Sequence, residues 1–312
     1  MLELVPIVSS ALIAFSIGSN DTSNAFGISV GCGALTFKKA TFLLLFFVLI
    51  GAILQGQKVM KTVGKDLVEL NLYPLSLALL FSAVLIAISN LKGFPVSTHQ
   101  VIIGSLIGSG FAFGLRVNSE ILLKIILSWI ISPFTSFFLS IILYMIIEKI
   151  TARFSLIRIE RILKALLLIS GMLIAYNTGA NELATAFGPV VHYGLLDQFQ
   201  ASLTGSILIW FGAITLSHRV IETIGKGITA LDPYSGFSAQ FGAGLSVWIF
   251  TSLGLPISTT YCIIGGISGV GTFKGMRTVK IGLVKRIVLN WILIPVSAFL
   301  ISYSISRITA FY

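Results

Sequence analysis

Long apolar stretches separated by short polar segments run along the whole chain. In the first half they span approximately residues 2–17, 40–57, 73–91, 95–114 and 121–148. In the second half they span approximately 162–176, 200–217, 237–253, 255–272 and 283–311. They do not alternate with a period of two, as the strands of a membrane barrel would, so they predict helices. The pattern indicates an all-α polytopic membrane protein.

The composition supports this prediction. Apolar residues make up 56% of the 312 residues and charged residues only 10%, whereas a soluble domain carries about 25% charged residues. The net charge of +10 does not indicate nucleic-acid binding, because the basic residues lie between apolar stretches and form no stripe interleaved with aromatic side chains. In those positions they set the membrane topology.

The chain is internally duplicated. A single shift of 161 residues aligns GSNDTSNAFG (18–27) with GANELATAFG (179–188), and the same shift aligns residues 51–65 with 212–226 and residues 93–108 with 254–269. The three windows share 20 identities in 41 positions, where composition alone gives roughly one in twelve. We therefore predict two membrane repeats, 1–148 and 162–312, joined by a cytoplasmic linker at 149–161.

The distribution of basic residues predicts that the second repeat is inverted. Segments 149–164 and 274–286 are rich in Lys and Arg, so we expect both to be cytoplasmic. The first-repeat counterpart of the latter, 113–124, carries only Arg116 and Lys124 and is expected outside. Each repeat then crosses the membrane an odd number of times. We expect a multi-pass protein of the plasma or inner membrane with both termini extracytoplasmic.

Two apolar stretches are poor candidates for simple spans. Residues 95–114 and 255–272 open with Ser-Thr pairs and contain several glycines. Such stretches, in corresponding positions of two inverted halves, are typical of broken or re-entrant helices that meet near the membrane midplane.

Acidic and amide residues interrupt the apolar pattern at corresponding places. Asp21 lies between two asparagines after the first stretch, and the Asn181-Glu182 pair repeats this feature. A carboxylate at the centre of a bilayer costs about 2.5 to 3.5 kcal/mol, so it is expected to face a partner or an ion. No Lys or Arg lies within either motif. Carboxylate, amide and hydroxyl oxygens suit Na⁺, and a carboxylate can also carry a proton.

The second pair of motifs predicts helix starts that bind an anion. GFPVSTHQ and GLPISTT each place Pro shortly before Ser-Thr, which favours a helix N-terminus. Free backbone N–H groups and the positive end of the helix dipole attract anions. The candidate anion ligands at the two starts are Ser97, Thr98, His99, Gln100, Ser258, Thr259 and Thr260.

Coupled transport would follow from such a site. Neither motif contains a basic residue, so a bound anion would depend on co-bound cations, and each would raise the other's affinity. Moving one negative charge inward against 100 mV costs about 2.3 kcal/mol, so more than one cation must accompany a monoanion.

The duplicated motifs GSNDTSNAFG and GANELATAFG resemble the signature of the inorganic phosphate transporter (PiT) family. The resemblance extends over essentially the whole chain and implies an inverted-repeat symporter that imports inorganic phosphate with Na⁺ or H⁺, commonly as a homodimer. The chain departs from the family at Thr22-Ser23, where small apolar residues are more usual, at Glu182, where Asp is frequent, and at Thr185, where Asn is frequent.

The resemblance implies roles for individual residues. The expected cation ligands are Asp21, Ser23, Asn24, Glu182 and Thr185. The expected phosphate ligands are the residues of the two helix starts together with Asn20 and Asn181. Na⁺ is the preferred coupling ion, as a co-transported substrate and not a cofactor, and a proton-coupled phosphate or sulfate permease is the alternative.

Other function classes fit less well. An enzyme is not expected, because the sequence contains no HExxH motif and no pairing of a nucleophile with a base. An ATP-driven pump is disfavoured because no GxxxxGK[ST] loop occurs. A passive anion channel stays open as an alternative, which concentrative uptake would distinguish.

Overall fold

The computed structural model describes residues 2–31, 33–91, 96–228, 232–275 and 281–310, and these segments are almost entirely helical. The first half contains α1 (Leu4–Gly31), α2 (Phe37–Lys61), α3 (Leu72–Leu91), α4 (Thr98–Ala112) and α5 (Ser119–Thr151). The second half contains α6 (Leu156–Asn177), α7 (Ala184–His192), α8 (Gln198–Ile228), α9 (Pro233–Ser252), α10 (Thr259–Phe273) and α11 (Ile281–Thr309). Two π-helical turns, η1 (Thr62–Asp66) and η2 (Thr178–Leu183), extend α2 and join α6 to α7.

The described residues include six helices long and apolar enough to cross a membrane. Large apolar side chains remain exposed on their outer faces, among them Phe42, Leu54, Phe138 and Ile292. In a water-soluble protein such surfaces would be buried, whereas in a bilayer they contact lipid. The fold is therefore that of the polytopic all-α membrane protein predicted from the pattern.

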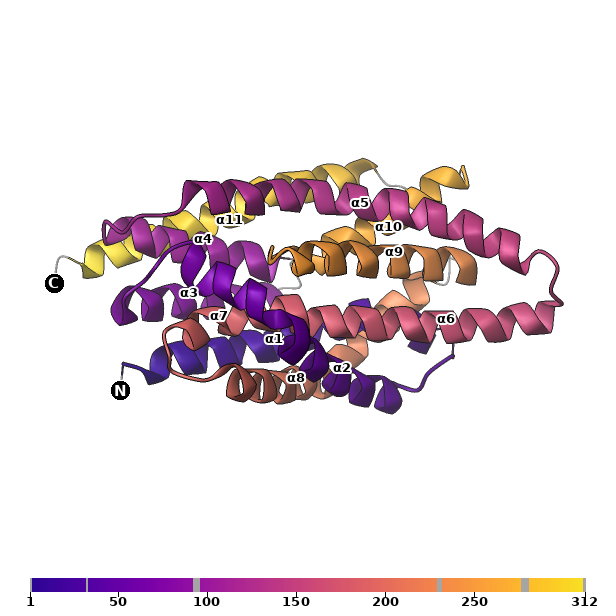
Figure 1. Cartoon of the computed structure of the whole chain (residues 1–312), viewed down its shortest axis with the longest axis horizontal. Coiled ribbons are helices and arrows are strands. Elements are labelled where there is room, and N and C mark those ends of the chain that lie inside the picture. The colour runs from indigo at the N-terminus through magenta and orange to yellow at the C-terminus, as the bar shows by residue number, and fades with distance from the viewer. Residues whose placement is uncertain (1, 32, 92–95, 229–231, 276–280, 311–312) are drawn as a thin grey trace.

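The two stretches that were expected to be re-entrant form the second arms of helical hairpins. α4 packs against α3, and α10 packs against α9. α4 and α10 are 15 residues long, or about 22 Å, which is shorter than the bilayer core of about 30 Å. The α3–α4 hairpin lies in the half of the molecule that contains both chain ends, and the α9–α10 hairpin lies in the other half (Figure 1).

The two halves of the chain exchange their first helices. Glycines allow α1 to contact α8 and the α6–η2 segment to contact α2 at very short range. A Cβ atom on Gly18 would lie 1.9 Å from the carbonyl oxygen of Ile209, and a Cβ on Gly179 would lie 1.9 Å from that of Val48. The two contacts are related by the shift of 161 residues. Gly51 and Gly212 complete the same crossings from the partner helices.

The hairpins are also packed against the opposite half of the chain. A Cβ on Gly104 of α4 would lie 2.5 Å from the carbonyl oxygen of Pro295 in α11, and a Cβ on Gly265 of α10 would lie 2.2 Å from that of Pro133 in α5. These are again corresponding residues. Because these glycine contacts occur in reciprocal pairs, a pseudo-two-fold axis relates them.

The connection between the repeats is shorter than predicted. α5 continues to Thr151 and α6 begins at Leu156. Most of the segment expected as a linker, 149–161, is therefore helical, and residues 152–155 alone connect the two helices. This connection lies at the end of the molecule opposite the first turn of α1 and the last turn of α11 (Figure 1).

Candidate functional site

The two signature motifs do not interrupt the helices, contrary to the prediction that they form polar breaks between apolar runs. The first lies inside α1, which is continuous from Leu4 to Gly31. The second spans the end of α6, the π turn η2 and the start of α7. A continuous helix satisfies its own backbone groups, so polar side chains can point sideways into the protein without exposing the backbone to lipid.

Hydroxyl groups in both motifs are also satisfied by the helix. The Thr22 Oγ1 donates to the carbonyl oxygen of Gly18 at 2.6 Å, and the Thr185 Oγ1 donates to that of Asn181 at 2.8 Å. Both threonines are fully buried. Such bonds to the preceding turn let the helix carry hydroxyl groups through an apolar environment.

Asn181 fastens the η2 turn to the connection between α9 and α10. Its amide Nδ2 donates to Thr251 Oγ1 at 2.6 Å and to the Leu255 carbonyl oxygen at 3.2 Å, and its Oδ1 accepts from the Ile257 N–H at 3.2 Å. The residue is completely buried. Its side chain was expected to contact phosphate, and in the structure it positions residues 253–258, which we call the hairpin-2 tip.

Glu182 lies between the two helix starts that the sequence singled out. Its Oε1 accepts a hydrogen bond from the Thr259 Oγ1 at 3.2 Å, and its Oε2 lies 3.3 Å from the His99 Nδ1. Thr259 begins α10 and His99 lies in the first turn of α4, so this carboxylate contacts both hairpins. Glu182 is 4% exposed and His99 is 1% exposed. The acidic group is therefore buried in protein and does not face bulk solvent.

The start of α4 carries buried polar atoms without a partner in the described part of the chain. They are Ser97 Oγ, His99 Nε2 and Gln100 Nε2. Ser97 occupies the N-cap position without making a side-chain capping bond. Buried polar groups are nearly always hydrogen-bonded, so three such atoms in one helical turn require a partner such as a water, an ion or a ligand. Residues 93–95 of the same motif lie outside the described residues.

The start of α10 is capped, and it lies close to the start of α4. The Ser258 side chain accepts a bond from the Tyr261 N–H at 3.4 Å. The Tyr261 hydroxyl in turn donates to Gln100 Oε1 at 3.3 Å. The two helix starts therefore lie side by side, as the repeat pattern predicted. The structure gives Thr98 no hydrogen bond within the described residues.

The first signature motif contacts the second hairpin as well. The Asn24 Nδ2 donates to Thr260 Oγ1 at 3.1 Å. Gln240 of α9 donates to the carbonyl oxygens of Asn24 and Ala25. Ser23 is buried beside them. The side chains of Asn20 and Asp21 lie outside the described part of the structure, so their assignments as phosphate and cation ligands stay predictions.

Several residues of this region were not found from the sequence. Gln240, Thr251 and Tyr261 hold the motifs in place, and Asn177 donates to the Gly244 carbonyl oxygen at 2.8 Å. Their counterparts one repeat earlier are Leu79, Asn90, Gln100 and Ser16. Most of these counterparts differ in type, so the internal duplication does not mark these residues. The amide side chains of Gln240 and Asn177 could have been noticed for another reason, because amides are rare in apolar helices.

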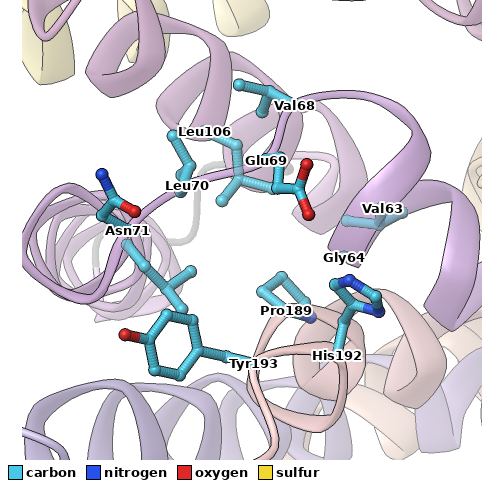
Figure 2. Close-up of a pocket in the computed structure, with 11 residues that line it drawn as sticks. Val63, Gly64, Val68, Glu69, Leu70, Asn71, Leu106, Pro189, His192 and Tyr193 are labelled. Carbon is cyan, nitrogen blue, oxygen red and sulfur yellow. The ribbon is translucent and has the colours of Figure 1, made fainter. Parts of the chain in front are cut away.

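Two surface cavities lie away from this buried cluster. One, of about 290 Å³, is lined by Glu69, Asn71, Leu106 and His192 among others (Figure 2). A neighbouring cavity of about 630 Å³ shares His192 and is lined by three lysines. Among the residues that line them, Gly188 belongs to a signature motif and none belongs to the hairpin-2 tip.

A family model settles the relationship of the chain to known proteins. The model described as "Phosphate transporter family" matches residues 17–159 and again residues 152–302. The chain belongs to the phosphate transporter family. The two successive matches also confirm the duplication found by self-comparison. Members of this family are transporters, so the expectation that the protein is not an enzyme is confirmed.

Relatives of the phosphate transporter family cover nearly the whole chain. A Methanocaldococcus jannaschii protein, named as a candidate phosphate permease, is 35% identical over 302 residues, with 96% of each chain covered. The sulfate permease CysP of Bacillus subtilis is 29% identical over 311 residues, covering 97% of this chain and 86% of its own. A solved structure titled "The sodium-dependent phosphate transporter" matches with a TM-score of 0.88 and 26% identity over 99% of both chains.

Proposed function

We propose that this protein is a secondary active symporter that imports inorganic phosphate together with Na⁺ across the plasma or inner membrane. The observation that carries the proposal is the position of Glu182. Its carboxylate is buried and contacts the first turns of α4 and α10 at once. A cation bound at this carboxylate would lie beside both helix starts, where an anion is attracted by the helix dipoles.

The unpartnered atoms at the start of α4 support phosphate binding there. Ser97 Oγ and Gln100 Nε2 can each donate a hydrogen bond to an oxyanion, and His99 Nε2 can do so when it carries the imidazole proton. Neither helix-start motif, GFPVSTHQ or GLPISTT, contains Lys or Arg. Part of the neutralising charge must then come from the co-transported cation, which makes the binding of the two substrates reciprocal.

The likeness to a sodium-dependent phosphate transporter supports Na⁺ as the coupling ion. Two observations favour a second candidate, a proton-coupled phosphate or sulfate permease. His99 lies 3.3 Å from Glu182, and an imidazole beside a carboxylate suits proton transfer better than Na⁺ coordination. The similarity to a sulfate permease supports the alternative anion.

We further propose an inverted arrangement of the repeats, with both termini outside and the α5–α6 connection in the cytoplasm. The reciprocal glycine contacts and the hairpins in opposite halves support it. A homodimer remains an expectation from the family resemblance.

Transport by purified protein in sealed vesicles tests this function. An imposed inward Na⁺ gradient should drive accumulation of labelled phosphate above its external concentration. Vesicles with only a proton gradient, and vesicles given labelled sulfate, serve as matched comparisons. Accumulation with the proton gradient alone would reject Na⁺ coupling, preference for sulfate would reject phosphate, and equilibration without accumulation would identify a channel.

A further inference from the structure

Three lysines at the end of α2 and in η1 line one surface cavity. Lys58, Lys61 and Lys65 are spaced by three and four residues, which places them on one helical face. The cavity has a volume of about 630 Å³. Its other lining residues are Gln57, Met60, Gly188, Val191, His192 and Gln198. Among the described residues that line it there is no acidic side chain, so the cavity is strongly positive.

A close contact between η1 and α7 forms the cavity wall. A Cβ on Gly64 would lie 2.4 Å from the Gly188 carbonyl oxygen and 2.8 Å from the Cβ of His192. Glycine at this position lets the two elements approach closely enough to bring His192 beside the lysines.

Two acidic groups lie near the lysine cavity without lining it, and one of them pairs with Lys61. Asp66 lies 3.7 Å from the Lys61 ammonium but does not line the cavity. Glu69 lines the neighbouring cavity, into which its carboxylate projects, with His192 at the boundary of the two (Figure 2). The positive charge of the lysine cavity is therefore not neutralised from within.

The lysine cavity also contacts the hairpin-2 tip. The Lys58 Nζ donates to the carbonyl oxygen of Ser252, the last residue of α9 before the tip, at 2.9 Å. Gly254 has a φ of +77°, which residues other than glycine rarely adopt, and a Cβ there would lie 3.2 Å from the Cβ of Lys58 and from Thr62 Oγ1, closer than an ordinary contact. The tip runs directly into Thr259, whose hydroxyl binds Glu182. One short segment thus separates the cavity from the buried site.

We propose that the lysine cavity binds a phosphate group at the outer entrance of the transporter. This inference rests on the proposed function and orientation, in which the end of α2 faces the outside. Each ammonium group offers three donors, and Lys58 uses one of them on Ser252. The chemistry fits the phosphate of the transported anion and equally the headgroup of an anionic phospholipid. If the group is free phosphate, binding here raises the substrate concentration next to the hairpin-2 tip. If it is a lipid headgroup, binding places an anionic lipid next to the tip.

Transport kinetics distinguish these two sources. The test variant combines Lys58→Gln, Lys61→Gln and Lys65→Gln, and a second variant with Arg at all three positions restores the charge. Lys124→Gln is the control, because Lys124 is an exposed lysine at the start of α5 that pairs with Glu120. Initial uptake rates are measured in neutral phosphatidylcholine vesicles and in vesicles containing phosphatidylglycerol, at low and high ionic strength.

If the cavity receives free phosphate, the Gln variant in neutral vesicles should have a KM about tenfold above wild type at low ionic strength, with an unchanged maximal rate. The difference should shrink at high ionic strength, because salt screens exposed charges. If the cavity holds a lipid headgroup, phosphatidylglycerol should stimulate the wild type and the Arg variant but not the Gln variant. Wild-type kinetics in both kinds of vesicle, or an effect no larger than that of Lys124→Gln, would overturn the proposal.

A chemical readout separates this proposal from the proposed function. Pyridoxal 5′-phosphate labels lysines at anion sites, and borohydride fixes the label for mass spectrometry. Inorganic phosphate or phosphatidylglycerol should protect Lys58, Lys61 and Lys65 from labelling while leaving Lys124 reactive. If the lysines are protected in a wild-type protein that accumulates no phosphate, the proposed anion binding in the lysine cavity stands and the proposed symport function is rejected. Equal labelling of all four lysines with and without these competitors would reject the cavity.

Discussion

At the scale of single residues, the buried cluster depends on a few side chains that connect different parts of the chain. Glu182 links the two hairpins, Asn181 holds the hairpin-2 tip, and Asn24 reaches Thr260. Each comes from a signature motif and bonds to a residue far away in the sequence. The motif residues therefore hold distant segments of the chain together, in addition to being candidate ligands.

Neutralising Glu182 without changing its shape should impair coupling. Glu182→Gln keeps an oxygen that can accept from Thr259 but removes the negative charge that attracts a cation. We expect cation-dependent uptake to fall by about ten- to a hundredfold, the effect of losing a charged interaction of about 1.5 to 3 kcal/mol. Uptake rates at graded Na⁺ concentrations, measured in vesicles, provide the check.

Glu120→Gln provides the matched control, because Glu120 is exposed and pairs only with Lys124 among the described residues. It should leave uptake at the wild-type rate. The role assigned to Glu182 is wrong if the two variants behave alike. Unchanged elution and thermal stability of Glu182→Gln would show that its loss of uptake is not a folding defect.

The sequence predicted the identity of these residues better than their partners. The acidic and Ser-Thr motifs stood out because polar groups in apolar surroundings are costly and because they occur twice. The contact between His99 and Glu182 could not be predicted, because it joins two residues that do not correspond in the repeats. Gln240 and Tyr261 were missed because their counterparts are Leu79 and Gln100.

At the scale of elements, apolar periodicity located the helices well and their ends poorly. α2 to α5 and α9 to α11 coincide closely with apolar runs, whereas α8 continues to Ile228, well past the run that ends at 217. α1 and α6–α7 continue through polar motifs that were expected to end them. Hydropathy identifies where a helix meets lipid, but helix continuity depends on backbone hydrogen bonds, which buried polar side chains do not disturb.

The glycines at the helix crossings should be irreplaceable, and this can be tested within one helix. In Gly51→Ala the new methyl would lie 1.9 Å from the Tyr176 carbonyl oxygen, so α2 and α6 must separate. We expect destabilisation of about 1 to 3 kcal/mol or more, the usual cost of overpacking. The measurement is the unfolding temperature of the purified variant in detergent.

Gly56→Ala is the internal control for this prediction. It lies in the same helix, and its Cβ would meet its nearest neighbour, the Ala184 Cβ, at 3.4 Å, an ordinary contact. It should unfold within a few degrees of the wild type. Equal unfolding temperatures for the two variants would show that the crossing is looser than the contact distance requires.

At the scale of the whole molecule, charge distribution and duplication together predict the orientation. The connection at 152–155, which lies within the basic segment 149–164, and the first-repeat loop at 113–118 should lie on opposite sides of the membrane. Single cysteines, introduced after Cys32 and Cys262 are replaced by Ser, can locate each loop.

Arg116→Cys and Gly194→Cys should react with a membrane-impermeant maleimide in intact cells, whereas Arg153→Cys should react only after permeabilisation. All three positions are in short connections between helices. The same labelling pattern at 116 and 153 would mean that the first repeat crosses an even number of times, and the inverted arrangement would then be abandoned.

The exchange of first helices has a consequence for the origin of this protein. Each repeat carries two of the glycines at which its helices cross those of the other repeat. They are Gly18 and Gly51 in the first repeat and Gly179 and Gly212 in the second. A lone copy would leave those glycines uncovered, so under the proposed inverted arrangement a single-copy ancestor would need a second molecule, inserted the opposite way up, to cover them. Joining both copies in one chain places the two partners of every crossing in the same molecule, and the copies differ in residue type at positions such as Asp21 and Glu182.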